Sequence, residues 1–146
     1  MKKKIVFLMC VLAMVTPVMA EPTCEGHGGK LITAHKATDE GCSDKTCNGH
    51  EFCKSDKPMN WWSAFTWCES QGRTLAEFKT MCPGVSQTPA DAEGACPNFQ
   101  GLSGSGEKLW SSLAYDSRTA LVVILSSGAV NSYSRYGTNG FYALCE

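Results

Sequence analysis

The clearest periodic pattern of the chain lies just after residue 60, where apolar residues recur at helical spacing. Asn60 is a favourable N-cap, and Gly72 is the kind of residue that ends a helix. The apolar residues between them stand at i, i+3, i+4 and i+7 and share one helix face: Trp61, Ala64, Phe65 and Cys68. The pattern predicts an amphipathic helix between Asn60 and Gly72.

A second helix is predicted directly after the first. Thr74 and Glu77 have the Thr-x-x-Glu spacing of a capping box, in which each side chain accepts a backbone N–H of the other residue. The pattern predicts a short helix over residues 75–81, which Pro83 and Gly84 end.

Short apolar runs after residue 108 predict strands over 109–113, 119–125, 129–133 and 141–145. Ser126, Ser127 and Gly128 form a three-residue hairpin loop with glycine at the left-handed position. Two helices followed by antiparallel strands indicate an α+β domain with a small antiparallel sheet.

Two stretches carry little apolar periodicity. Residues 21–58 are polar and are predicted to form a loop or hairpin layer without a core, with Asn48 and Gly49 as its tight turn. Residues 82–108 are rich in Gly, Ser and Pro and predict a long excursion with a one-turn helix at 89–93. Loops of that length are typical of functional or disordered segments.

Residues 1–20 have the pattern of a signal peptide. Lys2, Lys3 and Lys4 precede an apolar run of 11 residues, and small residues up to Ala20 fit a cleavage site. We expect cleavage after Ala20 and a secreted, periplasmic or cell-surface protein. The apolar stretch 5–18 is 14 residues long, short of the roughly 20 that span a bilayer, so no membrane span is expected.

Charge excludes nucleic acid as a partner. Without the three N-terminal lysines, 10 of the 13 Lys and Arg remain against 14 Asp and Glu, a formal charge of −4. Phosphate contacts need clustered cations, which this balance does not provide.

Cysteine usage agrees with export. Cys10 leaves with the signal peptide, and an even set of eight in an exported chain predicts a disulfide framework. Spacing leaves all three pairings among the first four open. A zinc site is the alternative, because Cys24-x2-His27 and Cys47-x2-His50-x2-Cys53 have ligand-like spacing. The eight cysteines are Cys24, Cys42, Cys47, Cys53, Cys68, Cys82, Cys96 and Cys145.

No convergent set of catalytic groups is visible, so an enzyme is not expected. All three histidines lie in the cysteine-rich N-terminal stretch, and no cysteine is spare for a thiolate. Ser103 and Ser105 are not in a Gly-x-Ser-x-Gly elbow. Asp91 and Glu93 are interpreted as solvated surface.

Residues 59–146 resemble C-type lectin-like domains. The segment Trp-Trp-Ser-Ala-Phe-Thr-Trp-Cys-Glu-Ser-Gln-Gly-Arg-Thr-Leu-Ala at 61–76 resembles their first helix, and Phe-Tyr-Ala-Leu-Cys-Glu at 141–146 resembles their last strand. The middle, Leu-Trp-Ser-Ser at 109–112 and Ser-Gly-Ala-Val-Asn-Ser-Tyr at 127–133, resembles compact bacterial surface forms, including the major-paralogous-domain group.

The resemblance implies a lectin-like fold with a bridge from Cys68 to Cys145, and we expect a second from Cys82 to Cys96. The calcium-binding triplets of sugar-binding members, Glu-Pro-Asn or Gln-Pro-Asp and Trp-Asn-Asp, do not occur in this chain. Calcium-dependent sugar binding therefore does not carry over, and no metal or cofactor is expected.

The segment 131–139 is the candidate binding site, because Tyr offers rigid contact area while Ser, Asn and Gly offer adaptable hydrogen bonds. An ordinary polar edge strand is the alternative. Val130 is predicted to face the core, leaving the opposite side to solvent. Trp62 is the tryptophan expected to be exposed, whereas Trp110 is expected in the core. The candidate residues are Asn131, Tyr133, Arg135, Tyr136 and Asn139.

Two functions fit these features. The first is an exported, non-catalytic recognition module, such as an adhesin, that binds a glycan or protein at the cell envelope or outside the cell without calcium. The second is a structural subunit of a surface assembly, such as a pilus or envelope complex, with the lectin-like fold as scaffold.

Overall fold

The computed structural model describes residues 23–34, 50–88, 96–104 and 106–146. Several predictions therefore lie outside the described residues. They are the signal peptide, the 48–49 turn, the 89–93 helix with Asp91 and Glu93, Ser105, and the partners of Cys42 and Cys47.

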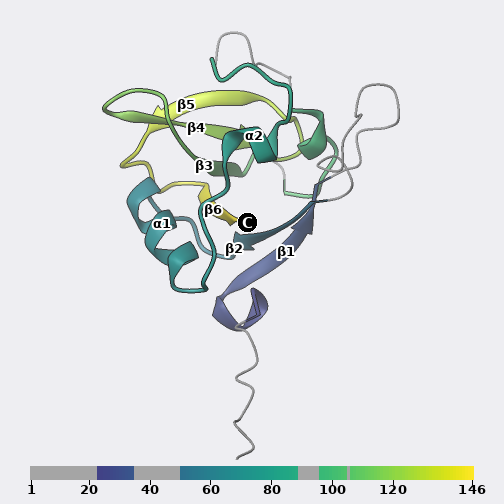
Figure 1. The fold of residues 1–146 in the computed structure, drawn as a ribbon, viewed down its shortest axis with the longest axis vertical. Coiled ribbons are helices and arrows are strands. Elements are labelled where there is room, and N and C mark those ends of the chain that lie inside the picture. Colours follow the sequence, from purple (N-terminus) through teal and green to yellow (C-terminus); the bar gives the residue numbers. More distant parts are fainter. Residues whose placement is uncertain (1–22, 35–49, 89–95, 105) are drawn as a thin grey trace, which may run out of the picture.

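The described chain forms a six-stranded sheet with short helices on both faces (Figure 1). The strands are β1 (Gly29–Thr33), β2 (Glu51–Ser55), β3 (Lys108–Ala114), β4 (Thr119–Ile124), β5 (Val130–Ser134) and β6 (Phe141–Cys145). The helices are α1 (Trp61–Glu69) and α2 (Phe78–Met81), with single 3-10 turns η1 (Glu25–His27) and η3 (Pro97–Phe99).

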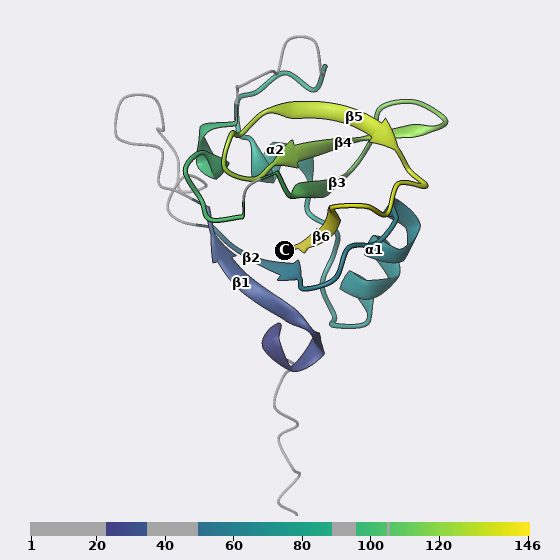
Figure 2. The same cartoon turned by 180° about the vertical axis from the view of Figure 1, so that it is seen from behind.

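The strand order is β1-β2-β6-β3-β4-β5, so the last strand lies in the middle of the sheet (Figure 2). All neighbours are antiparallel except β3 and β6, which run parallel. The predicted α+β class is confirmed, but the sheet is mixed rather than antiparallel. The difference arises because the chain crosses from β5, past β4 and β3, to the far side of β3.

α1 forms as the sequence predicts. The Asn60 side chain accepts a hydrogen bond from the Ser63 backbone N–H at 2.8 Å, and Gly72 adopts a left-handed φ of 67° just past the end. Ala64 and Cys68 are fully buried, and Trp61 is nearly so. The predicted helix face is therefore the one that packs on the sheet.

The second helix is shorter than predicted, because Thr74 does not cap it. Thr74 exchanges backbone hydrogen bonds with Glu146, and the Ala76 N–H donates to the Leu144 carbonyl at 2.7 Å. The segment is therefore extended along β6, and α2 begins only at Phe78. Backbone pairing with the final strand replaces the capping box.

Both faces of the sheet are buried. One cluster includes Phe52, Phe99 and Leu121 beneath α2 and η3, and the other includes Trp110 and Val122 beneath α1. The expectation that residues 21–58 contribute no core is wrong, since Phe52 is completely buried. The β1–β2 hairpin that carries it joins the main sheet through β6.

Three disulfides join the described cysteines: Cys24–Cys53, Cys68–Cys145 and Cys82–Cys96. The second and third are the pairs expected from sequence. The first is one of the pairings that spacing left open among the N-terminal cysteines.

Candidate binding surface

The start of α1 is held in place by hydrogen bonds from several elements. The Trp110 indole donates to the Met59 carbonyl at 2.9 Å, and the Trp61 indole donates to the Ser111 carbonyl at 2.8 Å. The Trp61 backbone N–H donates to the Arg135 carbonyl at 3.0 Å. These bonds fix the first turn of α1 beside the loop that follows β5.

Arg135 fills the space between that loop and α1. Its guanidinium carbon lies 4.6 Å from the centre of the Trp61 ring and 5.6 Å from that of Trp62. Its Nε donates to the Thr119 carbonyl at 3.2 Å, and a terminal nitrogen donates to the Asp116 carbonyl. The cation is thus packed on two indoles and tied to the β3–β4 loop.

The β3–β4 loop is itself ordered by the Asp116 carboxylate. This group accepts the backbone N–H bonds of Arg118 and Thr119, each at 2.7 Å. These bonds, that of Arg118 first, hold the pKa of Asp116 below its ordinary value, because they stabilise the charged form.

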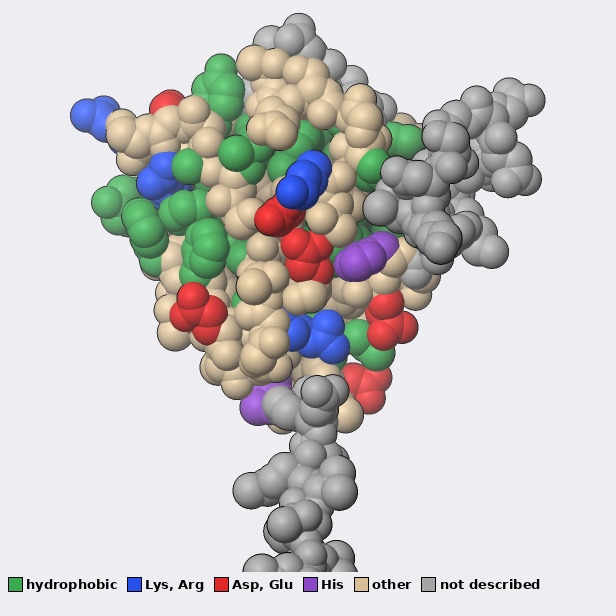
Figure 3. Space-filling model, in the orientation of Figure 1, with side chains coloured by type: hydrophobic (Ala, Val, Ile, Leu, Met, Phe, Trp, Pro, Cys, Tyr) green, Lys and Arg blue, Asp and Glu red, His purple; other side chains and the backbone are tan. Residues whose placement is uncertain are grey.

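Two large aromatic side chains remain exposed where these parts meet. Trp62, whose ring centre lies 5.6 Å from the Arg135 guanidinium carbon, is 51% exposed, and Tyr136, which follows Arg135 in the chain, is 73% exposed. We call Trp62, Arg135 and Tyr136 the aromatic surface. Figure 3 shows hydrophobic side chains gathered with a cationic one over α1 and the end of β5, on the left of the view.

The structure places the five residues predicted for the site in different environments. Arg135 and Tyr136 join the aromatic surface, and Asn139 is exposed in the loop before β6. Tyr133, however, is half-buried, with its ring 5.2 Å from that of Phe141 in an edge-on arrangement. The prediction that its side of β5 faces solvent is wrong for Tyr133, because its ring packs against Phe141 of β6 and the core cluster there; Asn131 on the same strand is half-buried as well.

Trp62 is exposed, as the sequence predicts, but its contact with Arg135 has no signal in the local sequence. The two residues lie 73 positions apart, and no local pattern connects them. The sequence signal that could point to Trp62 is its position among polar residues on the outer face of α1.

The outer face of α1 forms one wall of an open groove of about 560 Å³. Its lining contains two tryptophans, one methionine and three hydroxyl side chains, with no charged residue among them. The lining residues are Met59, Trp62, Ser63, Thr66, Trp67 and Ser70. Because Trp62 belongs to both, the groove and the aromatic surface are continuous.

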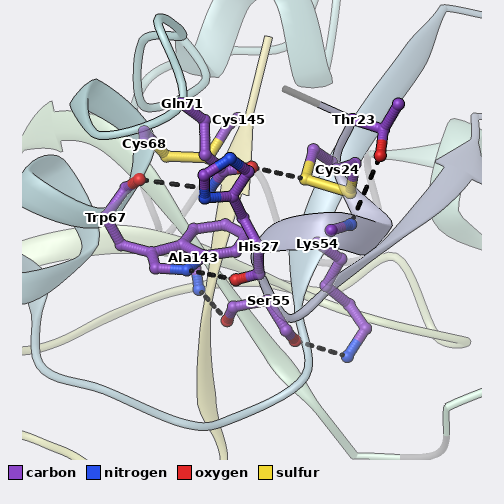
Figure 4. The surroundings of a disulfide bond; sticks show 12 residues. Thr23, Cys24, His27, Lys54, Ser55, Trp67, Cys68, Gln71, Ala143 and Cys145 are labelled. Carbon is purple, nitrogen blue, oxygen red and sulfur yellow. Dashed lines mark hydrogen bonds between the residues drawn. A yellow bond between two sulfur atoms is a disulfide. The ribbon is translucent and has the colours of Figure 1, made fainter. Parts of the chain in front are cut away.

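Two neighbouring disulfides lie near Trp67, which lines this groove. Cys53 and Cys145 are direct partners on β2 and β6, and their disulfides reach η1 and α1 respectively (Figure 4). The Trp67 indole N–H donates to the His27 carbonyl at 3.3 Å across this junction. The Cys68–Cys145 bridge therefore crosslinks α1, which carries the groove, to the sheet.

The zinc alternative loses two of its ligands, since Cys24 and Cys53 are joined to each other. Within the described ranges, no group of three or more His, Cys, Asp and Glu side chains is arranged to hold a metal ion.

A second, polar hollow of about 360 Å³ lies between the β1–β2 hairpin and the loop before β3. Lys54 is its buried cation, with Nζ 3.3 Å from the Glu107 carboxylate and 4.0 Å from the centre of the Tyr142 ring. The ammonium already has an anion, a carbonyl and an aromatic face as partners. We interpret it as a structural contact of the hairpin.

No protein-family model matches the chain, and no curated protein matches it in sequence. Among the described residues, no helix has the length and apolar character needed to cross a membrane.

Proposed function

We propose that this protein is an exported, disulfide-bonded, non-catalytic recognition module that binds a glycan or protein at the cell envelope or outside the cell. It acts without calcium, on a scaffold of the C-type lectin-like type. The helix-to-last-strand bridge Cys68–Cys145 and the central position of β6 support that scaffold.

The observation that carries the proposal is the aromatic surface. Trp62 and Tyr136 expose large rings, while Arg135 is held against the indoles by hydrogen bonds to two backbone carbonyls. Trp, Tyr and Arg dominate binding energy at interfaces, particularly where their geometry is fixed before binding. An exposed Trp and Tyr next to an Arg that is held in place therefore favour a binding role.

The alternative is a structural subunit of a surface assembly. The sheet has edge strands β1 and β5, and edge strands can add a strand from another chain. A stable homo-oligomer that buries Trp62 and Tyr136 would favour this second function.

A binding screen with matched variants tests the proposal. The oxidised protein is applied to a glycan array and to extracellular proteins, and each binder is measured again with Trp62→Ala. We expect at least a tenfold loss of affinity, because the removed indole is a central contact.

Leu31→Ala is the matched control. Leu31 is an exposed apolar side chain on β1, at the opposite edge of the sheet from β5. Its truncation should change affinity by less than about twofold, as for a residue outside the interface. Equal losses in both variants, or no loss in either, would contradict the proposed surface.

A further inference from the structure

We infer that the groove along α1 is a subsite for an uncharged pyranose ring, so that the ligand of the protein is a neutral oligosaccharide. The inference rests on the proposed function, since it names the chemical class of that ligand. It is carried by the composition and hydrogen bonding of the groove.

The apolar part of the groove consists of two indoles and a thioether. Trp62 is half exposed, and the Trp67 indole is partly buried against the protein core. The Trp67 N–H is already bonded to the His27 carbonyl, so the polar edge of that ring is satisfied from within the protein. The indoles can therefore offer the ligand mainly apolar faces, which suit the C–H face of a sugar ring.

A row of hydroxyl groups runs between the indoles. Ser63, Thr66 and Ser70 stand at i, i+3 and i+7 on one side of α1. The Thr66 hydroxyl donates to the Trp62 carbonyl at 3.4 Å, and the Ser70 hydroxyl donates to the Trp67 carbonyl at 2.7 Å. Since both hydrogens are used inside the helix, these two oxygens can only accept bonds from a ligand.

Two groove donors complement those acceptors. The Ser63 hydroxyl and the Trp62 indole N–H have no bonding partner among the described residues. The groove therefore presents acceptors and donors side by side with aromatic faces. A pyranose has this combination, because each ring hydroxyl both donates and accepts while the ring carbons are apolar.

The charge of the lining selects against ionic ligands. The groove residues carry no charged side chain, and the Thr66 and Ser70 oxygens, which only accept, are poor partners for a carboxylate or phosphate. The nearest cation, Arg135 beside Trp62, is already bonded to the Thr119 and Asp116 carbonyls. A proline-rich peptide, which also occupies aromatic grooves, has no N–H at proline to offer the Thr66 and Ser70 oxygens. The neutral sugar is the ligand that satisfies all of the polar groups.

The test is an NMR titration of the oxidised, full-length mature protein with neutral saccharides. The probes are glucose, galactose, mannose, N-acetylglucosamine and their short oligomers, followed through the tryptophan indole N–H signals. Trp62→Phe and Trp67→Phe assign the two groove signals. We expect at least one neutral saccharide to shift both signals with saturation, and its uronic-acid counterpart to bind more weakly.

Variants of the hydroxyl row provide the matched comparison. Thr66→Val and Ser70→Ala should each lower the affinity for that saccharide by about threefold to tenfold, the loss expected for one hydrogen bond. Thr33→Val, on the exposed side of the edge strand β1 and away from α1, is the isosteric control and should leave affinity unchanged. Urea unfolding of each variant confirms that the fold is retained.

Three results would overturn the inference: no saturable shift with any neutral saccharide, equal weakening by Thr33→Val, or a proline-rich peptide that binds the groove more tightly and displaces the saccharide. None of these three results contradicts the proposed function. That function is contradicted separately if Trp62→Ala leaves the affinity of every screened partner unchanged.

Discussion

Arg135 connects the aromatic surface to segments that are distant in the sequence. One guanidinium contacts two indoles of α1, the Asp116 carbonyl of the β3–β4 loop and the Thr119 carbonyl at the start of β4. The sequence predicts Arg135 as a solvent-facing binding residue, because strand alternation places it opposite Val130. The packed position instead gives it a structural role in addition to its place in the binding surface.

Arg135→Ala should therefore destabilise the protein by about 1–3 kcal/mol, the range for a packed cation–π contact together with bonds to a charged donor. Urea denaturation at neutral pH measures the loss. Arg118→Ala is the control, because Arg118 is exposed and its described bonds involve only its backbone. Equal effects of the two substitutions would show that the contacts of Arg135 contribute nothing to stability.

Asp116 gives the loop beneath Arg135 a defined pH dependence. The Arg118 and Thr119 backbone N–H groups lower its pKa in the folded state below the ordinary 3.8. A lowered folded pKa stabilises the protein above the ordinary value, and that stabilisation is lost as the pH falls through the folded pKa.

Asp116→Asn keeps an oxygen acceptor and removes the charge. The stability difference between wild type and this variant should be largest near neutral pH and should shrink as the pH falls below 3.8. Unfolding curves between pH 2 and pH 7 measure it. A difference that grows on acidification would have the wrong sign for this account.

At the scale of elements, the two predicted helix caps behave differently. Asn60 forms the expected bond to the Ser63 N–H, whereas Thr74 is exposed and its backbone pairs with Glu146. Asn60→Ala should therefore cost about 1 kcal/mol, and Thr74→Ala less than about 0.5 kcal/mol.

Chemical denaturation of the two single variants compares these values directly. Both substitutions truncate a polar side chain at a predicted helix start, so the loss of side-chain size is similar. A larger loss of stability for Thr74→Ala than for Asn60→Ala would indicate that the capping box forms, and it would contradict the extended path of residues 74–76.

The errors at this scale have a common physical origin. Local periodicity found α1 and all four strands after residue 108, because each has its own buried face. It could not show that β6 returns to the centre of the sheet, since that depends on pairing between distant segments. Because β6 is central, residues 74–76 pair with it, which explains why α2 is short. Because both sheet faces are covered, Tyr133 is partly buried.

At the scale of the whole molecule, the disulfides tie the segment before β1 to β2, α1 to the central strand β6, and the residue after α2 to the residue before η3. Peptide mapping of the oxidised protein should recover Cys24–Cys53, Cys68–Cys145 and Cys82–Cys96. A crosslink between Cys68 and any N-terminal cysteine would contradict the structure.

The bridges should also differ in their effect on stability. Cys68–Cys145 closes a separation of 77 residues and Cys82–Cys96 one of 14. In the chain-entropy model these correspond to about 4.5 and about 3 kcal/mol. The Cys68→Ala/Cys145→Ala variant should therefore unfold at lower urea concentration than Cys82→Ala/Cys96→Ala, and the reverse order would contradict this assignment.

The candidate surface was only partly accessible from sequence. Composition pointed to the Tyr- and Arg-containing segment after β5, because those residue types suit recognition. It could not reveal that Arg135 packs on Trp61 and Trp62, or that the hydroxyl row of α1 continues the same surface. Both features arise only when α1 and the β5–β6 loop are brought together by the sheet.

The central claim is that an exposed aromatic surface on a rigid scaffold binds the partner. Tyr136 tests it most directly, because its side chain is 73% exposed and its truncation should change stability by only about 0.5 kcal/mol. The measurement is a pair of curves for Tyr136→Ala, urea unfolding and binding to the partner found for the wild type. The account predicts unchanged unfolding with affinity at least tenfold weaker, and unchanged affinity per folded molecule would contradict it.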